Sequence, residues 1–224
     1  MRCFSIMSSS DQSSLQKRIS TIYGNYLDVV QPLLIDIEVV TGRFPTQVLN
    51  EIRSIFAHLA RANRCSESDI TVAENNCTKA ERHMKRAIFD CYKTLCFAYF
   101  ERVKLFYQEY ATVDLHLADN GNFLNGLNER EVSAKNAFLK ARKAEANGLN
   151  ISEDEIYKFY EEAYSSYEDL SAYIDSSTEA LNFAMSTTDK TKRSARWGLI
   201  FGALSALLAI ASIVEGIVIA SISG

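Results

Sequence analysis

A long interval without helix-breaking residues constrains the fold of this chain most strongly. Between Asp69 and Leu115 the sequence contains neither proline nor glycine. At a rise of about 1.5 Å per residue, this interval predicts a helical rod of roughly 60 Å or more. Apolar residues recur through it at the three- and four-residue spacings of one helix face: Cys77, Ala80, Met84, Ala87, Cys91, Leu95, Ala98 and Phe106. Aromatic residues at other positions predict contacts on more than one side.

The rest of the chain also has a helical character. Only 9 glycines and 2 prolines occur among 224 residues, fewer than the roughly 12% of average usage. Ser152 and Glu155 have the spacing of a capping box, which predicts a helix start there. Further helices are expected at 11–36 with a bend near Pro32, 46–62, 128–146 and 153–186. The predicted fold is all-α, an elongated antiparallel helical bundle followed by a single C-terminal transmembrane helix.

The carboxyl-terminal segment predicts the transmembrane helix. From Trp197 to Ile222 the only charged residue is Glu215, and a helix of this length would measure about 39 Å, more than the roughly 30 Å of a bilayer core. A basic cluster precedes it, and no charge follows it. The positive-inside rule therefore places the amino-terminal part in the cytoplasm. The cluster consists of Lys190, Lys192, Arg193 and Arg196.

These features predict a tail-anchored protein of the inner (cytoplasmic) membrane with one span. Residues 1–189 would form the cytosolic bundle for sensing and oligomerisation, 190–196 a basic juxtamembrane segment, and 197–224 the transmembrane helix. The amino terminus is too polar for a secretory signal. The five cysteines lack the spacing of a disulfide framework or a zinc site, and are expected to be small apolar residues in a reducing cytosol.

Small residues recur along the predicted span, beginning with a GxxxG at Gly198 and Gly202. Such a stripe favours close helix packing and predicts a homo-oligomer. A heptad seam would then bring Ser205, Ser212 and Glu215 together around an axis as pore-lining residues of a cation channel. Two alternatives stay open for Glu215: it reaches the far interface in a plain anchor, or it is neutral and hydrogen-bonds between helices.

A basic stripe on the long helix is the candidate ligand-binding site. Basic residues with helical spacing lie on one face, with aromatic residues close by, an arrangement that could hold a phosphate backbone and stack bases. The alternative is a solvated face that forms ion pairs with the acidic helix at 153–162. The candidate ligand-binding residues are Lys79, Arg82, His83, Arg86 and Lys93.

Motifs of catalysis are scarce. The chain has no glycine-rich phosphate loop, nucleophile elbow or HExxH, and only three histidines. No catalytic residue, metal site or cofactor is therefore assigned. The one pattern of interest is the R-x4-H spacing of Arg53 and His58. It resembles the motif of HEPN-fold ribonucleases, in which the arginine would stabilise phosphate charge and the histidine would transfer a proton. Ser54 departs from the residues usual after that arginine.

Two stretches carry a wider resemblance, "LNEIRSIFAHLARA" at 49–62 and "AERHMKRAIFDCYK" at 80–93. They are similar to loosely HEPN-like helical proteins of bacterial antiphage islands. Together with a following membrane helix, they resemble the ion-channel effector of the Hailong defence system. That resemblance implies an oligomeric channel controlled by a short oligonucleotide, made by a partner nucleotidyltransferase.

The sequence therefore predicts an ion-channel effector of antiviral defence rather than an enzyme. Its channel would be gated by a nucleotide or oligonucleotide bound to the helical bundle. The alternatives are a membrane-tethered HEPN-like ribonuclease using Arg53 and His58, and a tail-anchored scaffold without activity. The number of subunits, the identity of the ligand, the ion selectivity and the direction of gating stay open.

Overall fold

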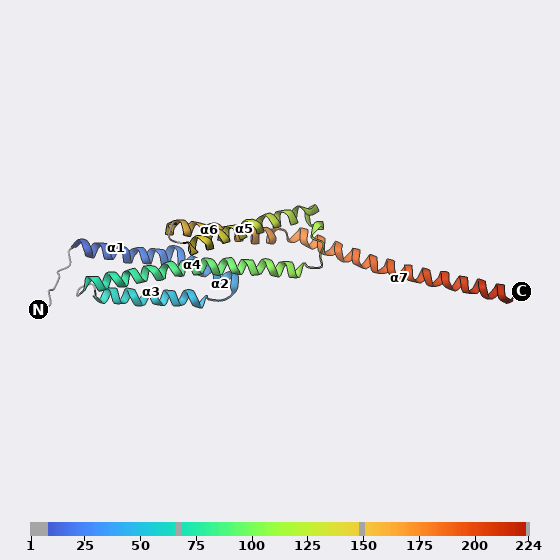
Figure 1. Ribbon diagram of the computed structural model, residues 1–224, viewed down its shortest axis with the longest axis horizontal. Coiled ribbons are helices and arrows are strands. Elements are labelled where there is room, and N and C mark those ends of the chain that lie inside the picture. The colour runs from blue at the N-terminus through green and yellow to red at the C-terminus, as the bar shows by residue number, and fades with distance from the viewer. Residues whose placement is uncertain (1–8, 66–68, 148–150, 223–224) are drawn as a thin grey trace. The chain divides into compact units, whose positions relative to one another are not determined.

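The computed structural model describes residues 9–65, 69–147 and 151–222, with side chains over 13–64, 69–147 and 151–205. Every regular element within these residues is helical, which confirms the predicted all-α bundle (Figure 1). In chain order they are α1 (Ser9–Asn25), the π-helix η1 (Tyr26–Val30), α2 (Gln31–Thr41), α3 (Thr46–Cys65), α4 (Ile70–Glu109), the 3-10 helix η2 (Leu115–Gly121), α5 (Asn122–Ala146), α6 (Glu153–Ser176) and α7 (Thr178–Ile222).

The chain divides into two compact units. Unit 1 contains the described residues up to Phe106 together with Glu129–Ala172, and unit 2 contains Tyr107–Asn128 and the described residues from Tyr173 onward. The large hydrophobic core belongs to unit 1. Because all candidate ligand-binding residues also fall in unit 1, its packing decides their surroundings.

The predicted bend near Pro32 is a π-helical turn. η1 separates α1 from α2, and Pro32 stands in the first turn of α2. Because proline has no N–H and its ring crowds the carbonyl four residues earlier, a wider turn just before it relieves the conflict. The helical course ends at Gly42, whose φ of 66° is left-handed and whose N–H bonds to the Glu38 carbonyl at 2.8 Å. The helix therefore extends five residues beyond the predicted end at Asp36.

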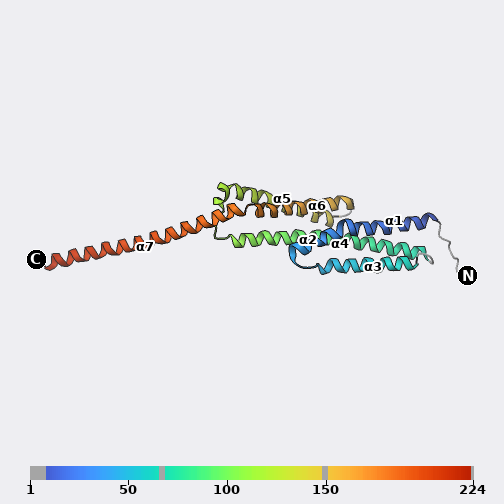
Figure 2. The same cartoon turned by 180° about the vertical axis from the view of Figure 1, so that it is seen from behind.

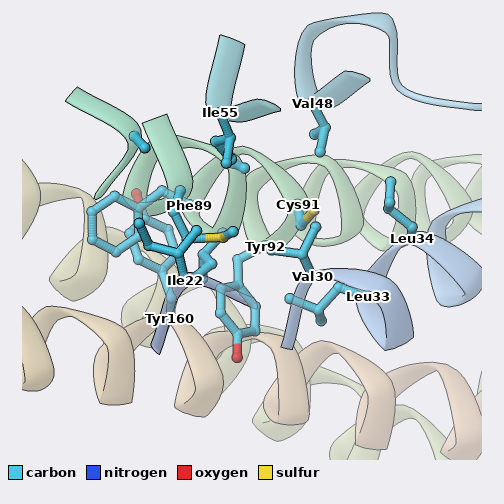
Figure 3. Packing of buried hydrophobic residues seen from close by; sticks show 14 of the residues in the cluster. Ile22, Val30, Leu33, Leu34, Val48, Ile55, Phe89, Cys91, Tyr92 and Tyr160 are labelled. Atoms are coloured by element: carbon cyan, nitrogen blue, oxygen red, sulfur yellow. The ribbon is translucent and has the colours of Figure 1, made fainter. Parts of the chain in front are cut away.

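Within unit 1, α4 lies at the centre of the core. The predicted stripe is buried from Cys77 to Leu95. Ile88, Phe89 and Tyr92 are also buried, on other faces of the helix, which confirms contacts on more than one side. The Phe89 ring lies 4.9 Å from Tyr157 and 5.3 Å from Tyr160 of α6. Figure 3 shows the rings of Phe89 and Tyr160 among aliphatic side chains from α1, η1, α2 and α3.

α3 and α4 form an antiparallel pair, visible from both sides (Figures 1 and 2). The buried residues Val48, Ile55 and Leu59 recur along α3 at helical spacing. Toward the start of α3, Gln47 Nε2 donates to Asp90 Oδ2 at 3.0 Å. Further along, His58 of α3 contacts Asn76 of α4. Both contacts agree with one antiparallel register.

Other helix boundaries also differ from the prediction. α4 ends at Glu109 instead of Leu115, where the Asp114 side chain accepts a hydrogen bond from the His116 N–H and starts η2. α5 begins at Asn122 instead of Asn128. The turn before it uses the left-handed conformation at Asp119, Asn120 and Gly121, residue types that tolerate it best.

A further difference is a break at Ser177 between α6 and α7, inside the predicted helix 153–186. The hydroxyls of Ser176 and Ser177 both bond to the Tyr173 carbonyl, at 2.9 and 2.8 Å. Hydroxyl side chains that occupy backbone carbonyls compete with the helix ladder. At the other end of α6 the predicted cap is present, since the Glu155 N–H bonds to Ser152 Oγ at 3.3 Å.

Unit 2 packs η2 against α7. Asp114 N–H donates to the buried Thr188 Oγ1 at 3.0 Å, and Lys192 Nζ donates to the Thr112 carbonyl at 2.7 Å. Lys192 belongs to the predicted basic juxtamembrane segment, which is part of the continuous helix α7 (Figure 1). Through the Lys192 contact with Thr112, this segment is therefore packed within unit 2 and is not an independent linker.

Among the residues that the structure describes, no helix carries a stretch both long and apolar enough to cross a membrane. The side chains of residues 206–222, most of the predicted span, lie outside this description.

Candidate functional site

Two of the three histidines in the chain meet between α3 and α4. The rings of His58 and His83 are stacked, with centroids 5.3 Å apart and planes inclined by 19°. Both side chains are partly buried. The pair joins the histidine of the R-x4-H pattern with the histidine of the basic stripe, which the sequence had placed in two separate hypotheses.

Each ring is oriented by a polar residue of the opposite helix. His83 Nδ1 lies 2.6 Å from Glu51 Oε2, and His58 Nδ1 lies 3.0 Å from Asn76 Oδ1. Glu51 and His58 are seven residues apart on α3, as are Asn76 and His83 on α4. Seven residues are about two helical turns, so each pair lies on one face. The antiparallel register then brings each ring to the partner helix's polar group.

These contacts determine which ring nitrogen carries hydrogen. A carboxylate only accepts hydrogen bonds, so Nδ1 of His83 must donate to Glu51. The Asn76 amide nitrogen donates to the Val72 carbonyl at 2.9 Å, which leaves its oxygen as the acceptor for Nδ1 of His58. In the neutral form of both imidazoles, therefore, Nε2 carries the lone pair.

Three of the five predicted ligand-binding residues lie exposed beside this pair. Lys79, Arg82 and Arg86 are all exposed, and they follow one another at one-turn spacings on the face of α4 that also carries His83. Across the described side chains, none of the three forms an ion pair or hydrogen bond. Their charges are therefore available to an anion. We call Lys79, Arg82, His83 and Arg86 the basic face of α4.

Lys93, the fifth predicted residue, has a different environment. Its Nζ lies 2.7 Å from Glu145 of α5 and 3.5 Å from Asp90. Glu145 also accepts from the hydroxyl of the fully buried Tyr160, at 2.5 Å, and from Arg142 at 2.8 Å. Lys93 is thus compensated within the bundle and does not belong to the basic face.

Lys93, Tyr160 and Arg142 surround Glu145, and we call these four residues the Glu145 cluster. The charge states of its members follow from their partial burial and their hydrogen bonds. Partial burial opposes ionisation of Glu145, but hydrogen bonds from Lys93 and Tyr160 outweigh it and leave the pKa of the carboxyl below its ordinary value. Burial, together with the hydrogen bond to Glu145, raises the pKa of Tyr160. Glu145 is therefore a carboxylate and Tyr160 a neutral donor near neutral pH.

The acidic helix pairs with other lysines. Glu153 lies 2.5 Å from Lys85, and Glu162 lies 3.0 Å from Lys140. Neither lysine belongs to the predicted stripe. The alternative in which the stripe forms ion pairs with residues 153–162 therefore finds no contact among the described side chains.

Arg53 does not join His58. Arg53 is exposed, and it makes no hydrogen bond or ion pair with any residue described with its side chain. Five residues along a helix correspond to a rotation of about 140° between the two positions. Within one chain, the arginine and the histidine of the R-x4-H pattern therefore point in different directions from α3.

The predicted pore-lining residues are described only in part. Ser205 is exposed, and its hydroxyl donates to the Phe201 carbonyl at 2.8 Å, as serines in apolar helices commonly do. The side chains of Ser212 and Glu215 lie outside the described residues.

Cysteine chemistry is not favoured where the structure describes it. Cys77, Cys91 and Cys96 are free and buried. Burial raises the pKa of the Cys91 and Cys96 thiols to about 12, so both are inert. Among the described side chains, no group of three or more His, Cys, Asp or Glu residues could hold a metal ion.

Sequence reasoning missed Glu51 and Asn76, the residues that orient the two rings. One signal was present, because each is seven residues from a histidine and therefore on the same helix face. The pairing of the two faces depends on the register between α3 and α4, which the sequence pattern does not contain.

The chain matches no protein-family model, no curated protein and no solved structure.

Proposed function

We propose that the basic face of α4 binds a phosphate-bearing ligand, a nucleotide or oligonucleotide, and that this ligand gates a homo-oligomeric membrane channel formed through residues 197–222. The observation that carries the proposal is the group of exposed cations at Lys79, Arg82 and Arg86, which no described acidic side chain neutralises. Positive charges left open on one helix face attract polyanions by release of counterions.

One oriented ring adds directionality to this anion site. His83, partly buried and held by Glu51, presents a fixed ring edge beside the three flexible cations. A site that combines an oriented ring with mobile charges can distinguish a phosphate group from a simple salt ion. The resemblance to Hailong effectors favours a short oligonucleotide, made by a partner nucleotidyltransferase, as the natural ligand.

The membrane part of the proposal rests on the sequence of residues 197–222 and its preceding basic cluster. In the proposed oligomer, Ser205, Ser212 and Glu215 line the conduction path, and Glu215 favours cations. The ligand biases gating only through a difference in its affinity for the closed and open forms.

Binding is tested with a fluorescent single-stranded oligodeoxynucleotide and the purified full-length protein in detergent, by polarisation at several salt concentrations. The variant K79Q/R82Q/R86Q should bind more weakly, and its slope of log affinity against log salt should fall by about 2, at roughly 0.7 per lost phosphate contact. R43Q/K143Q/K158Q removes the same charge from other exposed positions and should retain the slope. Equal losses in both variants would contradict a localised site.

The channel is tested by single-channel recording in planar bilayers, with and without the same oligonucleotide. We expect discrete cation-selective steps whose open probability changes with the ligand, and weaker selectivity in Glu215→Gln. A bilayer that stays silent under both conditions would remove the channel and leave a membrane-tethered binding protein or scaffold.

The ribonuclease reading keeps one favourable observation, the oriented ring of His58. It requires Arg53 to act with His58 of another copy of the chain, because the two do not meet within one chain. It predicts RNA cleavage that is lost in both Arg53→Ala and His58→Ala and that survives removal of 197–224. Cleavage that persists in either substitution would exclude it.

A further inference from the structure

His83 has the features of an oriented nucleophile. A neutral imidazole attacks through whichever nitrogen carries the lone pair, and the Glu51 contact at 2.6 Å reserves Nδ1 for hydrogen. The nucleophilic atom is therefore Nε2. The side chains of His83 and Glu51 are only 22% and 20% exposed, so this orientation is held by packing as well as by the hydrogen bond.

Nε2 of His83 is nevertheless open to solvent. Of the side chains described, none bonds to it. Nor is it one of the buried polar atoms that lack a partner. An atom of a partly buried residue that satisfies neither condition must be in contact with water. Nε2 therefore belongs to the uncovered edge of a ring whose side chain is only 22% exposed.

The cations beside it suit a phosphoryl group. Lys79 is one turn before His83, Arg82 is its neighbour, and Arg86 is one turn after it. A phosphoryl group brings three oxygens with about two negative charges, which arginine and lysine donors compensate. The same face that would bind the phosphates of a ligand thus surrounds a nucleophilic nitrogen.

We infer that His83 is a phosphorylation site, and that its Nε2 accepts the phosphoryl group of a phosphoramidate, a donor in which phosphorus is bonded to nitrogen. The Nε2 lone pair attacks phosphorus, and the new N–P bond forms as the donor's P–N bond breaks. The donor's protonated nitrogen departs as a neutral amine with the bonding electron pair. The ring keeps its Nδ1 hydrogen and gains a positive charge.

Glu51 stabilises that product. The positive charge acquired by the His83 ring is shared over both nitrogens, and the Glu51 carboxylate faces one of them. His58 provides an internal comparison, because its Nδ1 meets only the neutral amide of Asn76. An amide oxygen accepts the hydrogen bond but does not neutralise the charge, so His58 should be the slower nucleophile although both rings share the same stack.

The inference rests on the anion-binding part of the proposed function and is independent of the channel. It is tested by incubating the full-length protein with phosphoramidate at mildly alkaline pH. Intact mass and phosphorus NMR then follow the modification. We expect one acid-labile phosphoryl group on nitrogen per chain, absent in His83→Gln and retained in His58→Gln. Glu51→Gln should slow its appearance about tenfold to a hundredfold, the value of one charge-assisted hydrogen bond.

His116 is the matched control. It is exposed, and its ring forms no hydrogen bond or ion pair with any side chain that the structure describes, so its substitution by Gln should leave the fast modification unchanged. Labelling of His116 as fast as His83 would mean unselective chemistry and would overturn the inference. Absence of any phosphoryl group, or its persistence in His83→Gln, would do the same.

Three further measurements separate the possible failures. Circular dichroism of His83→Gln shows that loss of labelling is not loss of fold, and K79Q/R82Q/R86Q, which retains His83, should be labelled more slowly. Oligonucleotide polarisation is measured on the same preparations. Oligonucleotide binding without phosphorylation of the wild-type protein would overturn the inference and leave the proposed anion site standing. If the wild-type protein showed neither binding nor phosphorylation, the anion site itself would be excluded.

Discussion

Two regions of α4 contain basic residues in the same helical pattern and have opposite environments. Arg86 and Lys93 are seven residues apart on one face, yet Arg86 is exposed and without a described partner, whereas Lys93 is paired with Glu145. Glu145 of α5 lies beside Lys93 and pairs with it. The carboxylate that α3 brings near Arg86 is Glu51, and it pairs with His83 instead. A helical spacing of cations therefore predicts a face, but the neighbouring helices decide whether its charge is available to a ligand.

Substitutions around Lys93 and Glu145 should lower the stability of the fold more than substitutions around Arg86. Glu145→Ala leaves the Tyr160 hydroxyl without its acceptor, and it leaves Lys93 with the longer contact to Asp90 in a partly buried site. We expect a loss of about 2–4 kcal/mol in the free energy of unfolding, the range for breaking such networks. Urea unfolding followed by circular dichroism measures it.

Glu101→Ala is the matched control, because the one partner of Glu101 among the described side chains is Lys104, in an exposed ion pair. Its loss should cost less than about 0.5 kcal/mol. Equal losses in the two variants would mean that the Glu145 cluster contributes no more than a surface pair.

Stability should also depend on pH through Glu145. Because its folded-state pKa is lowered, the carboxylate contributes stability above its unfolded pKa of about 4.3. That contribution is lost as pH falls through the lowered folded-state pKa. Urea midpoints measured from neutral to acid pH should fall less steeply in Glu145→Gln than in the wild-type protein. Parallel pH profiles would show that other carboxyls dominate.

A smaller change isolates one hydrogen bond of the same cluster. Tyr160→Phe keeps the ring that packs on Phe89 and removes only the hydroxyl that donates to Glu145. We expect a loss of about 1–1.5 kcal/mol with unchanged helix content. A double-mutant cycle with Glu145→Gln should show that the two losses are not additive.

Substitutions in the basic face should change the stability of the fold least. K79Q/R82Q/R86Q removes exposed side chains without described partners, and its free energy of unfolding should change by less than about 0.5 kcal/mol. The same variant should lose oligonucleotide affinity, so stability and binding would separate. A large loss of stability would mean that the basic face stabilises the helical bundle, as the Glu145 cluster is expected to do.

Helix content was largely predictable from the sequence, because it depends on local residues. The interval without proline or glycine is α4, and Pro32 marks the bend between η1 and α2. The errors fell where short side chains compete with the backbone. Asp114 caps η2, so the long helix ends before the predicted Leu115. Ser177 breaks the helix predicted at 153–186, although the apolar periodicity of that region continues on both sides of it.

Less of the candidate site was predictable. The sequence identified Lys79, Arg82, His83 and Arg86 as one face from their spacing alone. It also placed Lys93 there, because nothing near Lys93 in the sequence indicates that Glu145, in another helix, neutralises it. His58 was assigned to a different hypothesis, since its stacking on His83 joins positions on two helices.

The sequence by itself determined which segments are helical and which side chains share a face, because both follow from a repeat of 3.6 residues per turn. Only the tertiary structure decided that Glu51 meets His83, that Asn76 meets His58 and that Glu145 meets Lys93. These pairs depend on the register and neighbourhood of whole helices. Register is selected by the packing of buried residues such as Ile55 and Cys77, which leaves little trace in the polar residues that it brings together.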